Sequence, residues 1–274
     1  VTGSFDNPAG FAACLCAGFP FVGFLLSDSN KYIRYVGGLI GFVIVIAVIL
    51  SQSRAGIMSI AFICFILLNM KFFHKRWVKY LSLLSFALLL SGCYWMKKDS
   101  ADGRLLIWRC SVSMVKDAPW LGHGIGSFEA RYMDYQADYF RQYGLNRYSM
   151  LADNVKHPFN EYLGVLLNFG FVGLLMILAL ITLLIYCYKK HPCAEKRIAF
   201  CSLISIGVFS FFSYTFTYPF TWIVTFLCII ILTKEYIAKV FTCPIIKNTV
   251  CIFILLCSFW GIYNLVKRVM AEKE

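Results

Sequence analysis

The sequence has few charged side chains and no pattern of metal ligands. Charged residues make up 15% of the 274 residues, whereas hydrophobic residues make up 60% and aromatic residues 18%. Soluble domains carry about 25% charged residues, so this composition excludes that class and predicts an integral membrane protein. No CxxC pair and no cysteine–histidine spacing typical of zinc sites occurs, and no internal repeat is visible. We therefore expect neither a metal site nor a repeat architecture.

Long apolar runs interrupt the chain at regular intervals. A helix needs about 20 apolar residues to cross the hydrocarbon core of a bilayer. About eight runs approach this length, near residues 9–26, 35–51, 55–70, 78–95, 163–186, 198–217, 219–237 and 247–266. The predicted fold is an all-α polytopic membrane protein with about eight transmembrane helices.

Basic residues predict the orientation of these helices. Lysine and arginine in short loops favour the cytoplasmic side, and they cluster here after the first, third, fifth and seventh runs. The alternate short connections contain only Arg54. The long polar interval 96–159 is therefore predicted to face outward, as are both termini. Because the formal net charge of +12 arises mostly from this topology, we expect no nucleic-acid partner.

The same pattern divides the chain into three regions. Residues 1–95 hold the first four predicted helices, residues 96–159 form the large outer loop, and residues 160–274 hold the last four. The sequence begins at Val1 with neither a methionine nor a signal peptide. We expect a fragment of a longer protein that lacks N-terminal spans and that can continue into an outer domain beyond Glu274.

The outer loop is predicted to contain two surface helices. Asp102 can cap the first, which Pro119 ends and whose apolar stripe is Leu105, Trp108, Val112 and Val115. The second follows Ser127, and its aromatic stripe is Phe128, Tyr132, Tyr135 and Tyr139. Tyrosine favours the bilayer interface, so this stripe predicts membrane anchoring, with sugar stacking as the alternative. Near it, Arg131, Arg141 and Arg147 could meet lipid headgroups or an anionic glycan.

Three glycines, Gly122, Gly124 and Gly126, lie between the two predicted helices. They permit tight turns and close backbone approach. A GxGxG string can also indicate nucleotide binding, but that interpretation requires a preceding strand and a βαβ unit, which this sequence lacks. A structural turn over the membrane surface is the better interpretation.

Three residues on the predicted outer side could carry chemistry. Pro158 suits the first position of a helix, which would make His157 its N-cap. The helix dipole there disfavours the imidazolium, so a neutral His157 could act as a general base. Arg54 and Arg104 could grip a diphosphate through paired guanidinium donors without a metal. The structural alternatives are a polar residue at a helix start, an interfacial arginine and a solvated arginine, respectively.

The order of several short motifs resembles the O-antigen ligase and O-antigen polymerase superfamily, which includes bacterial protein O-oligosaccharyltransferases. The resemblance covers nearly the whole chain, with the family's first spans missing. The motifs are Asn7-Pro8, Ser53-Arg54-Ala-Gly56, Gly103-Arg104 followed by Trp108, Pro119-Trp-Leu-Gly122-His-Gly124-Ile-Gly126-Ser-Phe128, and His157-Pro-Phe-Asn160-Glu-Tyr-Leu163 with Gly170 and Gly173.

The resemblance implies a glycosyltransferase of the membrane-embedded GT-C type in the bacterial inner membrane, with its active face in the periplasm. Its donor would be a polyprenyl-diphosphate-linked glycan. On matching positions, Arg54 and Arg104 would bind the donor diphosphate, and His157 would deprotonate the acceptor hydroxyl. Inversion is expected, with no metal and no cofactor. Members often carry a second histidine where this chain has Phe159, which puts the identity of the base in doubt.

Three acceptors remain open within this superfamily: a lipid A-core sugar, the growing glycan and a protein hydroxyl. The loop motifs resemble the ligase branch, so the lipid A-core acceptor is placed first, before polymerase and protein O-oligosaccharyltransferase activity. A flippase or transporter of the same lipid-linked glycan is the alternative from another class. Transporters place charged sites near the bilayer midplane, whereas the mid-span regions here are nearly free of charge. That distribution favours an enzyme.

Overall fold

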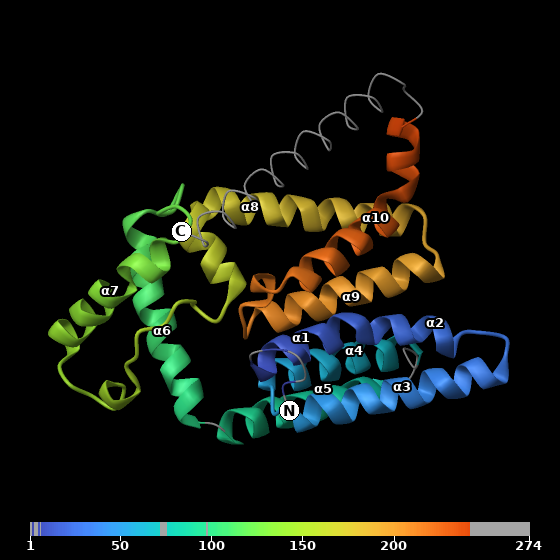
Figure 1. Cartoon of the computed structure of the whole chain (residues 1–274), viewed down its shortest axis with the longest axis horizontal. Coiled ribbons are helices and arrows are strands. Elements are labelled where there is room, and N and C mark those ends of the chain that lie inside the picture. The colour runs from blue at the N-terminus through green and yellow to red at the C-terminus, as the bar shows by residue number, and fades with distance from the viewer. Residues whose placement is uncertain (1, 3–4, 6, 72–75, 97, 242–274) are drawn as a thin grey trace, which may run out of the picture. The chain divides into compact units, whose positions relative to one another are not determined.

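The computed structural model describes residues 2, 5, 7–71, 76–96 and 98–241, and all regular elements in these residues are helical (Figure 1). Four helical segments of this part are long and apolar enough to cross a membrane, namely Pro8–Leu26, Lys31–Leu50, Glu161–Lys190 and Pro219–Ala238. The chain is thus an all-helical, multi-pass membrane protein. The last predicted span, near 247–266, lies outside the described residues.

Two of the predicted spans differ from expectation in their continuity or length. The first span is broken by a short 3-10 helix that contains Pro20, and the sixth ends at Ser210, before a 3-10 turn at Thr215–Thr217. The chain divides into two compact units after Leu232, and the second unit is described only for residues 233–241. The helices of this membrane scaffold are α1 (Pro8–Gly18), α2 (Val22–Leu26), α3 (Lys31–Leu50), α4 (Arg54–Lys71), α5 (Arg76–Met96), α9 (Ala194–Ser210) and α10 (Pro219–Phe241).

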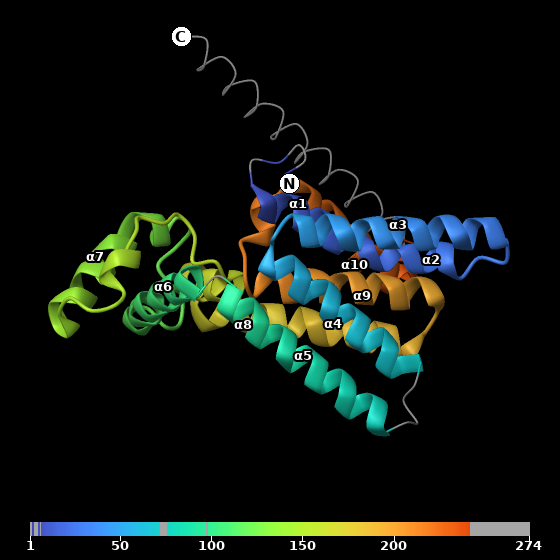
Figure 2. The same cartoon turned by 90° about the horizontal axis from the view of Figure 1, so that it is seen from below.

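Small side chains bring α1, α4 and α9 into contact, and Figure 2 shows these helices side by side. Ala12 on α1 is fully buried, and a Cβ added at Gly56 on α4 would lie 3.0 Å from the Cβ of Ala12. Buried hydroxyls join the same helices: Ser205 Oγ donates to the carbonyl of Cys16 at 2.7 Å and lies 2.7 Å from Ser59 Oγ. Close approach and hydroxyl bonds are typical of helix packing within membranes.

The predicted outer loop forms a separate core. It comprises α6 (Lys98–Asp117), α7 (Ser127–Tyr143), a 3-10 turn (Ser149–Leu151) and the first turns of α8 (Glu161–Lys190). Two details of the prediction for α6 were wrong. Asp102 lies inside the helix instead of capping it, and of the predicted apolar stripe only Trp108 and Val115 pack against the core, whereas Leu105 and Val112 are exposed. The buried stripe is formed by Leu106, Ile107, Cys110 and Met114.

The aromatic stripe on α7 packs inside this core. Phe128 and Tyr132 are buried, and their rings stack with centroids 4.9 Å apart. Tyr135 and Tyr139 are partly buried against the same core. The anchoring prediction was therefore wrong for Phe128 and Tyr132, because these rings bury against α6 and α8.

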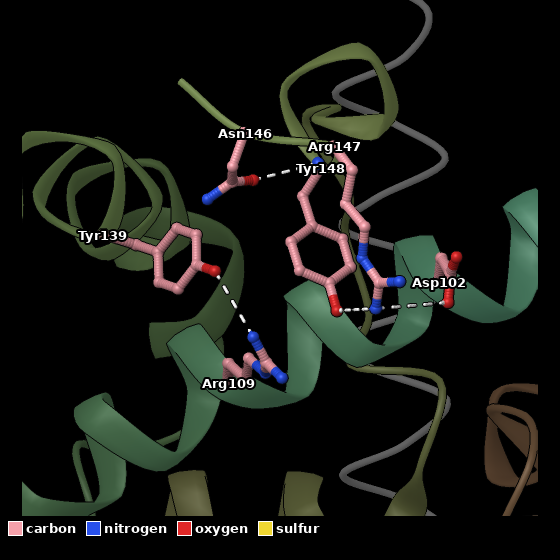
Figure 3. A network of polar contacts seen from close by, with 6 residues as sticks. All are labelled: Asp102, Arg109, Tyr139, Asn146, Arg147 and Tyr148. Atoms are coloured by element: carbon pink, nitrogen blue, oxygen red, sulfur yellow. Dashed lines mark hydrogen bonds and ion pairs between the residues drawn. The ribbon is translucent and has the colours of Figure 1, made fainter. Parts of the chain in front are cut away.

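A polar network joins α6 and α7 to the segment that follows α7 (Figure 3). The guanidinium of Arg109 lies over the ring of Tyr148 at 5.2 Å and that of Arg147 lies over it at 4.7 Å. Arg147 also donates to the Tyr148 hydroxyl at 2.6 Å and lies 4.0 Å from the Asp102 carboxylate. The buried position of Asp102 is thus explained by a charged partner within the loop, as expected for a buried carboxylate.

The helix α8 is broken at Gly170, where φ is 60° and ψ is −159°. The backbone of the Pro119–Gly126 turn approaches this break closely. A Cβ added at Gly170 would lie 2.3 Å from the backbone of Trp120, and one added at Gly122 would lie 2.6 Å from the backbone of Asn168. Only glycine fits either position, since both also have positive φ.

Backbone hydrogen bonds on both sides of the break hold the turn in place. The amides of His123 and Gly124 donate to the carbonyls of Leu167 and Asn168 at 2.8 and 3.0 Å; the amides of Phe171 and Val172 donate to those of Pro119 and Trp120 at 2.8 and 3.2 Å. The sequence predicted a tight turn here, and the positive φ angles of all three glycines confirm it. Its attachment to α8 satisfies backbone groups that the break would otherwise leave unpaired.

Candidate functional site

A cavity of about 210 Å³ lies where α6 meets the α3–α4 turn and the segment after α9. Both arginines predicted to bind diphosphate, Arg54 and Arg104, line this cavity. The full lining is Asn7, Pro8, Ala9, Ser51–Ala55, Ser100, Arg104 and Phe212–Tyr214. This lining, drawn from the described part of the chain, contains two guanidinium groups and no carboxylate. An anionic ligand is therefore the one that its charge favours.

Arg54 is the first residue of α4 and comes directly after a tight turn. Gln52 in that turn has φ of 51°, which is uncommon for a residue other than glycine. The turn is held by Ser51, whose hydroxyl donates to the carbonyl of Val48 at 2.7 Å. Arg54 itself donates from Nη2 to the hydroxyl of Ser100, on α6, at 2.7 Å. This bond links the scaffold side of the cavity to the loop side.

Arg104 projects from α6 and, like Arg54, is partly buried. Its Nη1 donates to the carbonyl of Phe212 at 2.8 Å, and its guanidinium lies 5.1 Å from the centroid of the Phe159 ring. Burial lowers the pKa of Arg104 to about 10, and the nearby positive charge of Arg54 acts in the same direction. The group still carries its charge at neutral pH, so two cations face the same cavity.

His157 does not line the cavity, but it contacts a residue that does. Its ring stacks on that of Tyr214, with centroids 4.8 Å apart and planes inclined by 28°. Phe159 meets the same tyrosine edge-on at 5.3 Å and lies beneath Arg104. The structure therefore brings His157 and Arg104 to neighbouring aromatic rings, and Tyr214 both contacts the histidine and lines the cavity of the arginines.

The local conformation of His157 corrects the sequence prediction. His157 is not an N-cap: α8 begins at Glu161, and Asn160 caps it by accepting the amide of Leu163 at 3.0 Å. Phe159 has a positive φ of 52°, and the indole of Trp108 donates to the carbonyl of Pro158 at 2.9 Å. These features hold the His157–Asn160 segment in a non-helical path.

The pKa of His157 is nevertheless lowered, for a reason other than the helix dipole. Partial burial disfavours the imidazolium and is the largest cause. The positive charge of Lys156 acts in the same direction, whereas the carboxylate of Glu129 opposes both. The neutral ring, which can accept a proton, is thus the main form at neutral pH.

Sequence reasoning did not identify the residues that position Tyr214. The side-chain amide of Asn7 donates to the Tyr214 hydroxyl at 3.1 Å and accepts a bond from Tyr218 at 2.9 Å and from the amide of Gly10 at 2.9 Å. Asn7 is thus both the N-cap of α1 and a support for the site. Tyr214 lay inside the apolar run 198–217, which predicted a membrane span, so it gave no signal of a site residue.

The other polar residues noted in the loop have structural partners. His123 lies with Nε2 2.8 Å from the carbonyl of Met114 and Nδ1 3.0 Å from Arg131 Nη1. Arg141 pairs with Asp138 at 2.8 Å. Within the described residues, no group of three or more histidine, cysteine, aspartate or glutamate side chains could hold a metal ion.

A protein-family model described as O-Antigen ligase matches residues 39–178. The matched segment covers just over half of the chain and contains Arg54, Arg104 and His157. It also contains the Pro119–Gly126 turn and the break in α8. No curated protein matches the chain.

Proposed function

The chain belongs to the O-antigen ligase family, and from this premise we propose that it moves a glycan from a polyprenyl-diphosphate carrier to a hydroxyl of lipid A-core. Membership makes it a membrane glycosyltransferase whose substrates are lipid-linked glycans. The observation that carries the finer proposal is the cavity in which Arg54 and Arg104 converge without a lining carboxylate.

The two arginines are proposed to bind the donor diphosphate. A guanidinium presents parallel N–H donors to phosphate oxygens, and two of them can neutralise a diphosphate without a metal ion. Arg104 is oriented by the carbonyl of Phe212, and Arg54 is oriented by the hydroxyl of Ser100. In the proposal, the two guanidinium groups bind the diphosphate from the α6 side and the α4 side of the cavity.

His157 is proposed to act as the general base. Its neutral ring takes the proton of the acceptor hydroxyl while the hydroxyl oxygen attacks the anomeric carbon. The bond between that carbon and the diphosphate oxygen breaks, and polyprenyl diphosphate leaves with its charge stabilised by the arginines. Attack from the face opposite the leaving group inverts the anomeric carbon. Burial of His157 supports the role because it keeps the imidazole unprotonated at neutral pH.

The proposed topology has about eight spans in a GT-C-like arrangement, with residues 1–95 and 160–274 in the membrane and residues 96–159 outside it. The site would then face the periplasm of a bacterial inner membrane. Basic residues after α4 and α8 support this orientation, since Lys189 and Lys190 end the long helix α8. Arg54 lies at the start of α4, and the loop precedes α8. Both would therefore lie on the side of the membrane opposite the basic residues that end these two helices.

A polymerase or a protein O-oligosaccharyltransferase would use the same donor cavity, so the acceptor must be determined directly. Vesicles containing the full protein and a labelled polyprenyl-diphosphate glycan can be offered lipid A-core, a second lipid-linked glycan or a hydroxyl-bearing protein in separate reactions. Transfer to lipid A-core alone is expected. Movement of the intact donor across the bilayer without transfer would instead indicate the flippase alternative.

Substitutions test the assigned roles. His157→Ala is expected to lower transfer at least about 100-fold, since a general base contributes that much or more. Arg54→Ala and Arg104→Ala are expected to weaken donor use more than acceptor use. Arg141→Ala, at an exposed arginine that pairs with Asp138 away from the cavity, is the matched control and should retain activity.

Three results would contradict the proposal. Normal transfer by a well-expressed His157→Ala protein would exclude His157 as the base. A defect of the arginine variants that is confined to the acceptor would exclude diphosphate binding. Loss of transfer in a chelator, restored by a divalent ion, would overturn the metal-independent mechanism.

A further inference from the structure

The Pro119–Gly126 turn exposes large apolar side chains. Trp120, Leu121 and Ile125 are 69%, 75% and 84% exposed, respectively. The turn contains no lysine, arginine, aspartate or glutamate. Its one polar side chain, His123, points inward to Met114 and Arg131. Contiguous apolar side chains of this kind mark a surface that contacts something other than water.

The break in α8 marks the level at which a bilayer would begin. After Gly170 the helix continues through Lys190, and these 20 residues give a length of about 30 Å, enough to cross the hydrocarbon core. Exposed apolar side chains line this part, beginning with Phe171 and Val172 and continuing through Leu175. Before the break, Leu163 and Leu167 pack in the loop core, where Leu167 is fully buried, and only Phe169 next to Gly170 is exposed among the large apolar side chains of this part.

The apolar turn lies at this same level. Its backbone is hydrogen-bonded to α8 on both sides of Gly170. The indole of Trp120 meets the ring of Phe171, the first residue after the break, at 6.1 Å in an edge-to-face arrangement. The surface of the turn is therefore continuous with the apolar surface of the spanning helix. Tryptophan is enriched at this depth because its ring is apolar while its N–H can reach water.

We infer that the Pro119–Gly126 turn is an interfacial anchor, which inserts Trp120, Leu121 and Ile125 into the boundary between acyl chains and headgroups of the bilayer. The occupant of this surface is lipid. Burial of these three side chains in the bilayer stabilises the membrane-bound position of the loop, because each burial removes apolar area from water. This inference concerns a surface distinct from the catalytic cavity and does not depend on the proposed chemistry.

A photo-crosslinking experiment with a matched control tests the anchor. The photoreactive residue p-benzoylphenylalanine replaces Ile125 in one variant and Leu145, which is 88% exposed and follows α7, in the other. Each full-length protein is placed in vesicles of phosphatidylethanolamine and phosphatidylglycerol with radiolabelled acyl chains. After irradiation, the lipid label bound to the protein is measured, and an unchanged elution profile in detergent verifies folding.

We expect lipid labelling at position 125 to exceed that at position 145 several-fold. Equal labelling at the two positions, or crosslinking of position 125 to protein instead of lipid, would overturn the inference. A second variant with the photoreactive residue at Leu121 repeats the measurement, so that misfolding of a single variant cannot decide the result. Transfer activity is not the readout, and the outcome is therefore separate from that of the His157 and arginine variants.

Discussion

The outer loop and the membrane scaffold are stabilised by different kinds of packing. The loop buries large side chains such as Tyr132, Leu106 and Met114 and surrounds them with charged and tyrosine side chains. The scaffold helices α1, α4 and α9 also bury Phe209 and Ile60, but they add contacts through alanine and glycine and hydroxyl bonds between serines and the backbone. Water drives burial of large apolar side chains, whereas within lipid only close approach and hydroxyl bonds favour association.

The difference has a consequence for the candidate site, which lies where the two regions meet. Arg104 and Ser100 belong to the loop helix α6, Arg54 belongs to the scaffold, and the bond from Arg54 to Ser100 connects the two regions in this cavity. Loosening of either region should therefore disturb the distance between the two guanidinium groups. Truncation of a large buried side chain should disturb either region more than the loss of a single hydroxyl bond.

The largest expected effect is that of Tyr132→Ala in the loop core. Removal of a large buried aromatic ring costs about 4 kcal/mol of stability. The comparison variant is Ser205→Ala in the scaffold, where loss of a hydroxyl bond between helices costs about 1 kcal/mol. Hydrogen exchange of the loop amides should rise sharply in the first protein and little in the second. Equal effects on the loop would show that the two regions do not fold as separate cores.

Gly170→Ala should break the connection between the regions. The new Cβ would lie 2.3 Å from the backbone of Trp120, and a positive φ is costly for alanine. The combined cost should be about 3 kcal/mol. Limited proteolysis between residues 118 and 126 is the measurement, and cleavage should become much faster. Gly164→Ala on the same helix, where the added Cβ meets only Pro158 at 3.7 Å, should behave as the parent protein.

Substitutions of Tyr214 test the candidate site, where the loop and the scaffold meet, from the scaffold side. Tyr214→Ala removes the ring on which His157 stacks, and we expect about a tenfold loss of kcat with a changed pH profile. Tyr214→Phe keeps the ring and loses only the bond from Asn7, so most of the activity should remain. If both variants lost activity equally and kept the parental pH profile, the ring would have no positioning role for the histidine.

The smallest expected effect concerns the pH dependence of transfer. Because His157 must be neutral to act as a base, activity should rise with pH through its pKa, and a lowered pKa moves that rise below the usual range of histidine. Lys156→Gln removes a charge that lowers this pKa, so the rise should move to higher pH. Glu129→Gln should move it to lower pH. Both shifts should be small, since Lys156 and Glu129 are mostly exposed and form an ion pair at 3.6 Å.

The sequence predicted the helical segments and the family better than the local geometry of the helices. Apolar runs identified the helical segments, and the order of short motifs identified a family that the match over residues 39–178 confirms. The buried face of α6 was predicted only in part, because a stripe of apolar side chains does not reveal which neighbour it meets. The break at Gly170 was missed because a single glycine in an apolar run is compatible with a continuous helix.

The candidate site was predictable only in part, for a similar reason. Charge sidedness placed Arg54 and Arg104 on one side of the membrane, and the cavity brings them together. The cap assigned to His157 was wrong because the proline rule could not show that the helix begins at Glu161, after an intervening Phe159 with positive φ. Tyr214 could not be found, since its contact with His157 spans a long sequence separation and depends on tertiary packing.

The paired hydrogen bonds across the α8 break set limits on how this protein can be recombined with its relatives. The carbonyls of Leu167 and Asn168 and the amides of Phe171 and Val172 all depend on the Pro119–Gly124 backbone. A chimera that exchanges the outer loop at residues 96 and 159 would separate these partners. A functional chimera should exchange the segment from before α6 to beyond Val172, so that the turn and the break come from the same parent protein. Insertions should be tolerated near Leu145, which is exposed and distant in sequence from both.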